Sequence, residues 1–319
     1  MAVVPSIQAF LDELKALPEI DMDRITPEQY RAKEKEMLAM DQGGERVEKV
    51  ENRTLPLEGR DIPVRVYTPV EGEAQYPGLV YYHGGGWVIG DLDSHDSICR
   101  LIANQAKCVV VSVDYRLAPE HKYPAAVEDA YDSLVWVAGH TSEFDIDGQR
   151  LAVGGDSAGG NLSIVTCIKA YEQGGPDIKH QFLLYPSTGF KGETPPASMM
   201  ENADGYFLTL EMMQWFSKHY FNDPKERNHP YASPIMYKDL GKLPSATLLT
   251  AQYDPLRDEG KAFADELKSG GVNVFYKNYD GLIHGFGNFI GFSPESEQAL
   301  REGAEQLEKV FAQKNEPQR

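Results

Sequence analysis

The apolar residues at the start of the chain recur at the spacing of helices. In residues 5–17 they fall on one helical face, and Ser6 is placed to cap the first turn. A second helix is predicted from Thr26, because the threonine, the proline that follows it and Gln29 form a capping box. Both helices precede the first strand signals, so we expect them to be added to a core and to cover a site.

From about residue 45 the spacing becomes that of strands. Residues 47–57 and 61–69 alternate apolar and polar side chains, as half-buried antiparallel strands do. Nearly continuous apolar runs then follow, which suit strands buried on both faces of a parallel sheet. These runs are residues 78–82, 108–113, 151–155, 182–186 and 246–251.

Helical stretches separate the later strands. This alternation predicts an α/β fold with a mostly parallel, doubly wound sheet and antiparallel N-terminal strands. Residues 187–235 break the alternation with proline, methionine and aromatic residues. We therefore expect N-terminal helices in residues 1–44, a core of residues 45–186 and 236–319, and an inserted helical segment of residues 187–235. The helices of the core are expected at residues 125–140, 158–173 and 258–271, with a last strand at 272–279 and a final helix capped by Ser293.

The charge and the cysteine content indicate which classes of partner are not expected and in which cell compartment the protein is expected. The net charge of −18 repels nucleic-acid phosphates and anionic lipids, so we expect neither nucleic acid nor membrane as a partner. No apolar run reaches the length of about 18 residues that a transmembrane helix needs, and the first residues lack the segments of a signal peptide. The chain has three cysteines, Cys99, Cys108 and Cys167, and their spacing is irregular. An odd number without a regular spacing indicates reduced, buried thiols and not a set of disulfides. A cytoplasmic protein is the expectation.

The segment GDSAG at residues 155–159 carries the strongest chemical signal. It fits the pattern G-x-S-x-G, with a buried strand before it and a predicted helix after it. A strand–turn–helix of this kind places the serine in a strained turn with its hydroxyl exposed at the carboxyl edge of the sheet, so Ser157 is the candidate nucleophile. Gly155 and Gly159 are expected to let neighbouring backbone pass closely. Asp156 is expected to face away and make a supporting hydrogen bond.

Three consecutive glycines follow the strand at residues 78–82, in the segment HGGGW. Glycines let backbone N–H groups point into a cavity without a Cβ in the way. We expect the N–H groups of Gly85, Gly86 and Ala158, the residue after the serine, to form an oxyanion hole.

The chain order serine, acid, histidine goes with a site of this kind. Among the histidines after Ser157, only His284 follows a strand and an acid-bearing loop, which makes it the candidate general base. Asp254 directly follows a buried strand and is the candidate acid that would orient the histidine. Asp258 and Glu259 are rivals, but they lie at a predicted helix start, where acidic residues are commonly caps or dipole partners.

These motifs together resemble the hormone-sensitive lipase family of bacterial carboxylesterases, in its GDSAG subgroup, within the α/β-hydrolase fold. The resemblance extends to the segment DYRLAPEH, which we expect to brace the glycine loop and not to form a second site. The resemblance implies a helical cap formed by the N-terminal helices of residues 1–44 and the inserted segment of residues 187–235. Its further implications are esters of short to medium acyl chains as substrates, no cofactor and often a homodimer. It also implies the site residues already reached: Ser157, Asp254 and His284 as the triad, and Gly85, Gly86 and Ala158 as the oxyanion hole.

The expected reaction is a two-step acyl transfer through an acyl-enzyme on the serine. No metal is expected, because the chain has no H-E-x-x-H or comparable cluster. Ester pockets of this kind are mostly apolar. The candidates to line it are Trp87, Phe207, Leu208, Met212, Phe216, Leu256, Ile283 and Phe286.

Three other functions compete with a carboxylesterase. An amidase or peptidase could use the same triad, because a fold does not fix a function. A non-catalytic ligand receptor on this scaffold would typically lack the histidine, which is present here. A lipase acting on insoluble fat would need a large exposed apolar patch, of which a mean hydropathy of −0.44 gives no hint.

Overall fold

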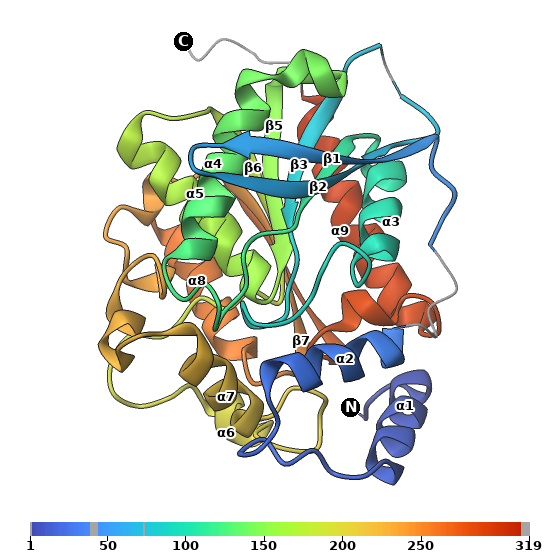
Figure 1. The fold of residues 1–319 in the computed structure, drawn as a ribbon, viewed down its shortest axis with the longest axis vertical. Coiled ribbons are helices and arrows are strands. Elements are labelled where there is room, and N and C mark those ends of the chain that lie inside the picture. The colour runs from blue at the N-terminus through green and yellow to red at the C-terminus, as the bar shows by residue number, and fades with distance from the viewer. Residues whose placement is uncertain (1, 39–43, 73, 314–319) are drawn as a thin grey trace.

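The computed structural model describes residues 2–38, 44–72 and 74–313, and within them one eight-stranded sheet crosses the molecule (Figure 1). Its strand order is β1-β2-β4-β3-β5-β6-β7-β8. The pairs β1–β2 and β2–β4 are antiparallel and the later pairs are parallel, which confirms the predicted fold class. The strands are β1 (Lys49–Leu57), β2 (Arg60–Thr68), β3 (Tyr76–Tyr82), β4 (Val109–Val113), β5 (Ile146–Asp156), β6 (Ile178–Leu184), β7 (Ser245–Tyr253) and β8 (Val274–Ile283).

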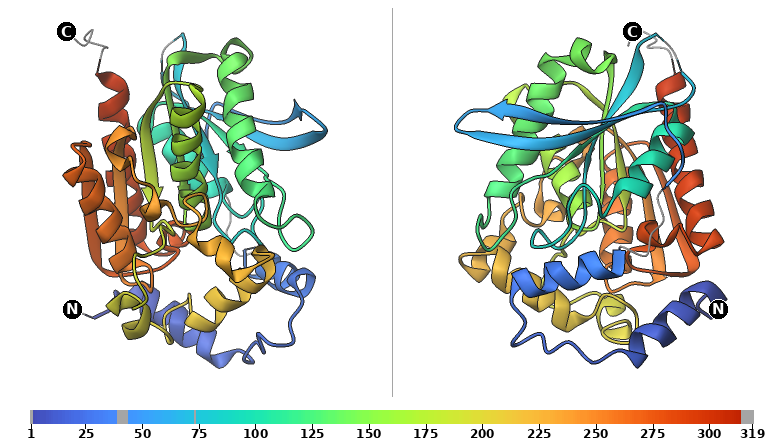
Figure 2. Two further views of the ribbon diagram at one scale, coloured as in Figure 1. Left: turned by 90° about the vertical axis from the view of Figure 1, so that its left-hand side faces the viewer. Right: turned by 45° about the vertical axis from the view of Figure 1, so that its right-hand side comes forward.

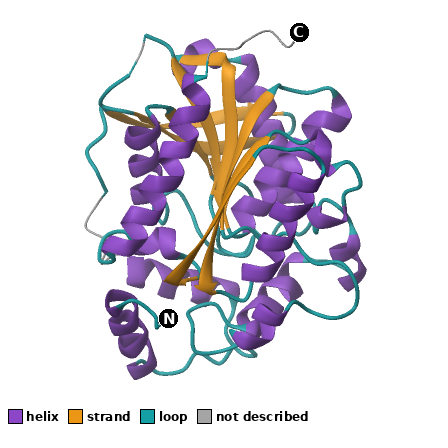
Figure 3. Ribbon diagram, turned by 180° about the vertical axis from the view of Figure 1, so that it is seen from behind, coloured by secondary structure: helices purple, strands orange, loops and turns teal. Residues whose placement is uncertain are grey.

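Helices cover both faces of this sheet (Figure 3). The helices α3 (Asp96–Ala106) and α9 (Pro294–Ala312) pack together on one face. The other face carries α4 (Ala125–Gly139), α5 (Ala158–Gln173) and α8 (Arg257–Ser269). Helix α3 is the one core helix that the predicted pattern lacks.

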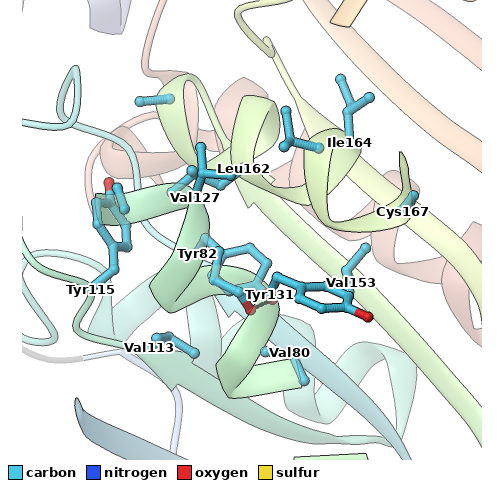
Figure 4. Close-up of a cluster of buried hydrophobic side chains, with 14 of the residues drawn as sticks. Val80, Tyr82, Val113, Tyr115, Val127, Tyr131, Val153, Leu162, Ile164 and Cys167 are labelled. Carbon is cyan, nitrogen blue, oxygen red and sulfur yellow. Dashed lines mark hydrogen bonds between the residues drawn. The ribbon is translucent and has the colours of Figure 1, made fainter. Parts of the chain in front are cut away.

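The alternation of side chains along β3 supplies both halves of the core. Leu79 and Tyr81 face α3 and α9, whereas Val80 and Tyr82 face α4 and α5, and all four are fully buried. Figure 4 shows the half of the core on the side of α4 and α5, where Tyr82 lies among aliphatic side chains of these helices. A parallel sheet covered on both faces explains why the strands could be recognised as continuous apolar runs.

Helices of the cap lie at the end of the sheet where the parallel strands finish (Figure 2). They are α1 (Pro5–Ala16), α2 (Pro27–Leu38), α6 (Ala197–Glu201) and α7 (Leu210–Tyr220), and we call them the cap helices. Helix α1 is tied to the core where the N–H of Val4 donates to the carbonyl of Gly281 at 3.0 Å.

Two of the three predicted helix caps are present. Thr26 and Gln29 exchange backbone-to-side-chain hydrogen bonds of 3.2 and 3.0 Å, and the hydroxyl of Ser293 accepts an N–H in the first turn of α9. The predicted cap by Ser6 is wrong. The N-cap position of α1 is Val4, one residue before Pro5, and the Ser6 hydroxyl contacts Ser293 instead.

The cysteines are free thiols in the core, as expected. Among the described residues, none of the helices combines the length and the apolar character needed to cross a bilayer.

Candidate active site

The turn between β5 and α5 holds Ser157 in a strained conformation. Its φ of 51° and ψ of −115° are unusual for a residue with a side chain, and its N–H is fixed by the carbonyl of Leu184 at 2.9 Å. The following helix lies so close to β3 that a Cβ on Gly159 would come within 1.8 Å of the carbonyl oxygen of Tyr82. The glycines around the serine are therefore needed for a close approach, as predicted.

Ser157, His284 and Asp254 lie in one hydrogen-bonded row. The His284 Nε2 atom is 3.0 Å from the Ser157 hydroxyl, and Nδ1 is 2.8 Å from Oδ2 of Asp254. The aspartate is fully buried, and its other oxygen accepts the N–H of Leu256 at 2.7 Å. With Nδ1–H donating to the carboxylate, Nε2 is left to accept the proton of the hydroxyl.

The two rival acids are occupied elsewhere. Asp258 accepts the N–H of Ser198 at 2.8 Å. Glu259 accepts the N–H groups of Thr188 and Gly189 at 2.8 and 3.2 Å, and burial raises the pKa of its carboxyl to about 7. Of the three acids considered, the structure brings Asp254 to the histidine.

The glycine loop bends towards the serine. Gly85 and Gly86 have φ values of 106° and 58°, and a Cβ on Gly86 would lie 2.3 Å from the ring of Phe216. These two glycines line the same cavity as Ser157 and Ala158. The structure thus gathers the three predicted oxyanion donors around the candidate nucleophile.

Asp156 connects this loop to the serine turn. It is buried, and its carboxylate accepts the N–H of Gly84 and the hydroxyl of Tyr81, each at 2.9 Å. The His95 ring lies 3.2 Å away. Burial opposes ionisation of Asp156, but the neighbouring His95 and Tyr81 outweigh it and lower the pKa of the carboxyl. The supporting role expected for Asp156 is confirmed by these bonds.

The segment at residues 114–121 braces the other side of the loop. The Tyr115 hydroxyl donates to the carbonyl of His83 at 2.8 Å, and the N–H of Ala118 donates to the carbonyl of Trp87 at 2.9 Å. This arrangement agrees with the structural role predicted for the segment.

Arg116 in the same segment belongs to a partly exposed ion-pair cluster centred on Asp129. Its side chain donates to the carboxylate of Asp129 at 2.8 Å, and Arg60 binds the same carboxylate. Asp129 is fully buried. These contacts join the segment to α4 and β2 and do not face the serine.

Helix α2 holds the glycine loop from the cap side, a contact that no sequence motif indicated. Arg31 donates to the carbonyls of Val88 and Ala118, each at 2.8 Å, and forms a two-point pair with Glu120 at 2.8 and 2.9 Å. One turn further on, Glu34 accepts a backbone N–H of the loop at 3.1 Å. Helix α2 thus contacts the backbone next to the loop that carries the candidate donors.

A cavity of about 1240 Å³ opens at the serine and is lined by residues of the cap helices and of the core. Two of the predicted lining residues are wrong: Ile283 and Phe286 are fully buried in the core on the α9 side and do not reach the cavity. Phe286 packs edge-on against Tyr185, with centroids 4.8 Å apart. The predicted residues that do line the cavity are Trp87, Phe207, Leu208, Met212, Phe216 and Leu256.

Five phenylalanines of the cavity wall were not among the predicted residues, and three of them, Phe10, Phe289 and Phe292, lie together. The two later ones follow Phe286 at three-residue intervals, a repeat that the sequence displays. Phe10 comes from α1, and nothing local to it reveals a partner almost 280 residues away.

Comparison with known proteins agrees with this geometry. A family model described as alpha/beta hydrolase fold matches residues 79–288. The carboxylic ester hydrolase LipN of Mycobacterium tuberculosis is 45% identical over 76% of this chain, which spans only 65% of LipN. Carboxylesterase NlhH of the same organism is 41% identical over 82% of this chain and 83% of its own length. A thermostable esterase from Pseudomonas putida superimposes with a TM-score of 0.93 at 37% identity, over 98% of this chain and 99% of that one.

Proposed function

Because this chain belongs to the hormone-sensitive lipase family of the α/β-hydrolase fold, we propose that it is a serine carboxylesterase acting on esters of short- to medium-chain acids. The observation that carries the proposal is the row Asp254–His284–Ser157, which ends on a hydroxyl inside a mainly apolar cavity. The named relatives are ester hydrolases, which supports the choice of ester over amide bonds.

In the first step the Ser157 oxygen attacks the ester carbonyl while its proton passes to Nε2 of His284. Asp254 keeps Nδ1–H in place and stabilises the imidazolium that forms. The imidazolium then gives the proton to the alkoxy oxygen, so the C–O bond breaks and the alcohol leaves. The acyl group stays on the serine as an ester.

The negative charge that develops on the carbonyl oxygen needs donors already in place. The N–H groups of Gly85, Gly86 and Ala158 are the groups that we assign to it. Ala158 is the first residue of α5, where the helix dipole also favours negative charge. Loss of a single donor of this kind costs about 3 kcal/mol in the transition state.

In the second step a water molecule gives a proton to His284 and attacks the acyl-enzyme. The tetrahedral intermediate collapses when the histidine returns the proton to Ser157, which frees the acid and restores the starting state. The protein needs no further group for either step.

We further propose that residues 1–44 and 187–235 act together as the cap of this enzyme. Side chains from both segments, such as Phe10 and Met212, line the cavity and support this division. We also propose a cytoplasmic homodimer that binds small-molecule esters and no nucleic acid. Light scattering coupled to gel filtration tests the dimer.

The test is hydrolysis of a p-nitrophenyl ester series, from acetate to dodecanoate, by the native enzyme and by Ser157→Ala. We expect the native enzyme to prefer the shorter chains and the variant to lose activity on all of them. Ser269→Ala, an exposed serine at the end of α8, is the matched control and is expected to keep full activity. Native activity restricted to anilides and other amides would overturn the proposal in favour of an amidase, and no activity on either would favour ligand binding.

A further inference from the structure

Four phenylalanines from three distant parts of the chain meet in the wall of the cavity. Phe10 comes from α1, Phe207 from the segment before α7, and Phe289 and Phe292 from the segment before α9. The ring centroid of Phe289 lies 4.9 Å from that of Phe10, 5.3 Å from that of Phe207 and 5.5 Å from that of Phe292. We call these residues the phenylalanine cluster.

The phenylalanine cluster lies directly beside the candidate general base. Gly285 follows His284, and a Cβ at this glycine would be 3.2 Å from the ring of Phe207 and 3.9 Å from that of Phe289. Tyr185 packs edge-on against the imidazole, with centroids 4.9 Å apart. The core tyrosine thus packs against the imidazole, and the phenylalanine cluster forms the part of the cavity wall next to the residue after the histidine.

The chemistry decides which half of an ester reaches this wall. The alkoxy oxygen must take a proton from Nε2 of His284, so the alcohol half of the substrate has to lie on the histidine side. The carbonyl oxygen turns instead towards Gly85 and Gly86. We propose that the phenylalanine cluster is the leaving-group subsite and that it selects esters of aromatic alcohols, an inference that rests on the proposed esterase function.

The geometry of the rings favours an aromatic guest. The pairs within the phenylalanine cluster are tilted or edge-on, with interplanar angles from 34° to 83°, which are the arrangements in which ring edges and faces attract each other. A further ring can continue this packing, whereas an alkyl group gains only from the burial of its surface.

The exposure of one ring suits a subsite from which a product must leave. Phe292 is 47% exposed, so the phenylalanine cluster reaches the surface and the released alcohol has a short way out.

The backbone at Phe207 holds its ring in place. Phe207 has a φ of 30°, an unfavourable value for a residue with a side chain. Strain of this kind persists where the surroundings hold it, and here it keeps the ring against Gly285 and Phe289.

The test compares benzyl acetate with cyclohexylmethyl acetate. Both esters release primary alcohols of similar size and acidity, and both leave the same acetyl-enzyme, so the ratio of their kcat/KM values reports on the leaving group alone. We expect the native enzyme to favour benzyl acetate by about three- to tenfold. Phe207→Leu and Phe289→Leu are expected to bring the ratio close to one. Phe190→Leu, a phenylalanine of the same cavity outside the phenylalanine cluster, is the control and is expected to keep the ratio.

Each outcome has a separate meaning. If the native enzyme hydrolyses both esters equally well, the aromatic preference is overturned while the esterase function stands. If neither these esters nor the p-nitrophenyl series is hydrolysed, the proposed function itself fails. If the ratio stays high in the leucine variants, the subsite lies elsewhere. Phe292→Leu, which alters a half-exposed ring, provides the same comparison should a more buried variant fold poorly.

Discussion

The buried carboxyl of Glu259 makes the stability of this protein depend on pH in a direction that can be worked out. Its side chain is 3% exposed, and burial raises its pKa from the usual 4.5 to about 7. Between these values the folded protein keeps a proton that the unfolded chain has lost. The contribution of this group to the free energy of unfolding is therefore largest below pH 4.5. It decreases as the pH rises from 4.5 and is lost once the pH has passed about 7.

The replacement Glu259→Gln removes this dependence and keeps the shape of the side chain. The amide oxygen of glutamine can still accept the N–H groups of Thr188 and Gly189, which the carboxylate now accepts. The shift from 4.5 to about 7 corresponds to about 3 kcal/mol. We therefore expect the variant to match the native protein at pH 4.5, to exceed its stability increasingly between pH 4.5 and 7, and to keep a constant advantage of about 3 kcal/mol above pH 7.

Urea unfolding followed by tryptophan fluorescence at several pH values from 4.5 to 8.5 measures this difference. The control is Asp258→Asn, one residue earlier in α8. Burial opposes ionisation of Asp258, but the charge and hydrogen bond of Arg257 and the hydrogen bonds from Ser198 together outweigh it and lower the pKa of the carboxyl. Its contribution to stability is lost only as the pH falls below the range measured, so this variant is expected to differ from the native protein by a constant amount. A Glu259→Gln difference that does not change with pH would refute the reasoning.

Three further substitutions probe the support of the site. Arg31→Met removes the hydrogen bonds from α2 to the carbonyls of Val88, next to the glycine loop, and Ala118, and steady-state kinetics should show kcat reduced about tenfold or more with little change in KM. An equal rise in KM would contradict a positioning role. Asp129→Ala leaves the guanidinium groups of Arg60 and Arg116 without their buried partner, and urea unfolding should show a loss of about 3–5 kcal/mol, with a loss below 1 kcal/mol as the contrary result. Ser293→Ala removes the cap of α9, and thermal unfolding should show a loss of about 1 kcal/mol that Ser293→Thr largely restores.

The sheet and the candidate triad were accessible from the sequence for a physical reason. Strands buried on both faces must be apolar throughout, and the residues that follow them at the carboxyl edge are brought together whatever the connections do. Ser157 and Asp254 each end such a strand or directly follow it. The positions of these residues along the chain, together with that of His284, were therefore enough to predict that they meet at one edge of the sheet.

The cavity wall was less predictable, because the direction of a side chain depends on contacts that are distant in sequence. Ile283 and Phe286 flank the histidine closely, yet both turn into the core beneath α9. Phe10 reaches the cavity only because α1 packs against the segment before α9. Helix α3 does carry a local signal, because its buried Ile98, Leu101 and Ile102 recur at helical spacing, yet the predicted pattern lacks it.

The bond between the backbone of Val4 and that of Gly281 has a practical consequence for handling the protein. Gly281 is three residues from His284, so the first residues of the chain are fastened beside the site. An affinity tag or fusion partner attached at the N-terminal end would strain this attachment and crowd the mouth of the cavity. The last turn of α9 lies at the opposite end of the molecule, as Figure 2 shows. Purification handles, surface immobilisation and fluorescent reporters are therefore best attached at the C-terminal end.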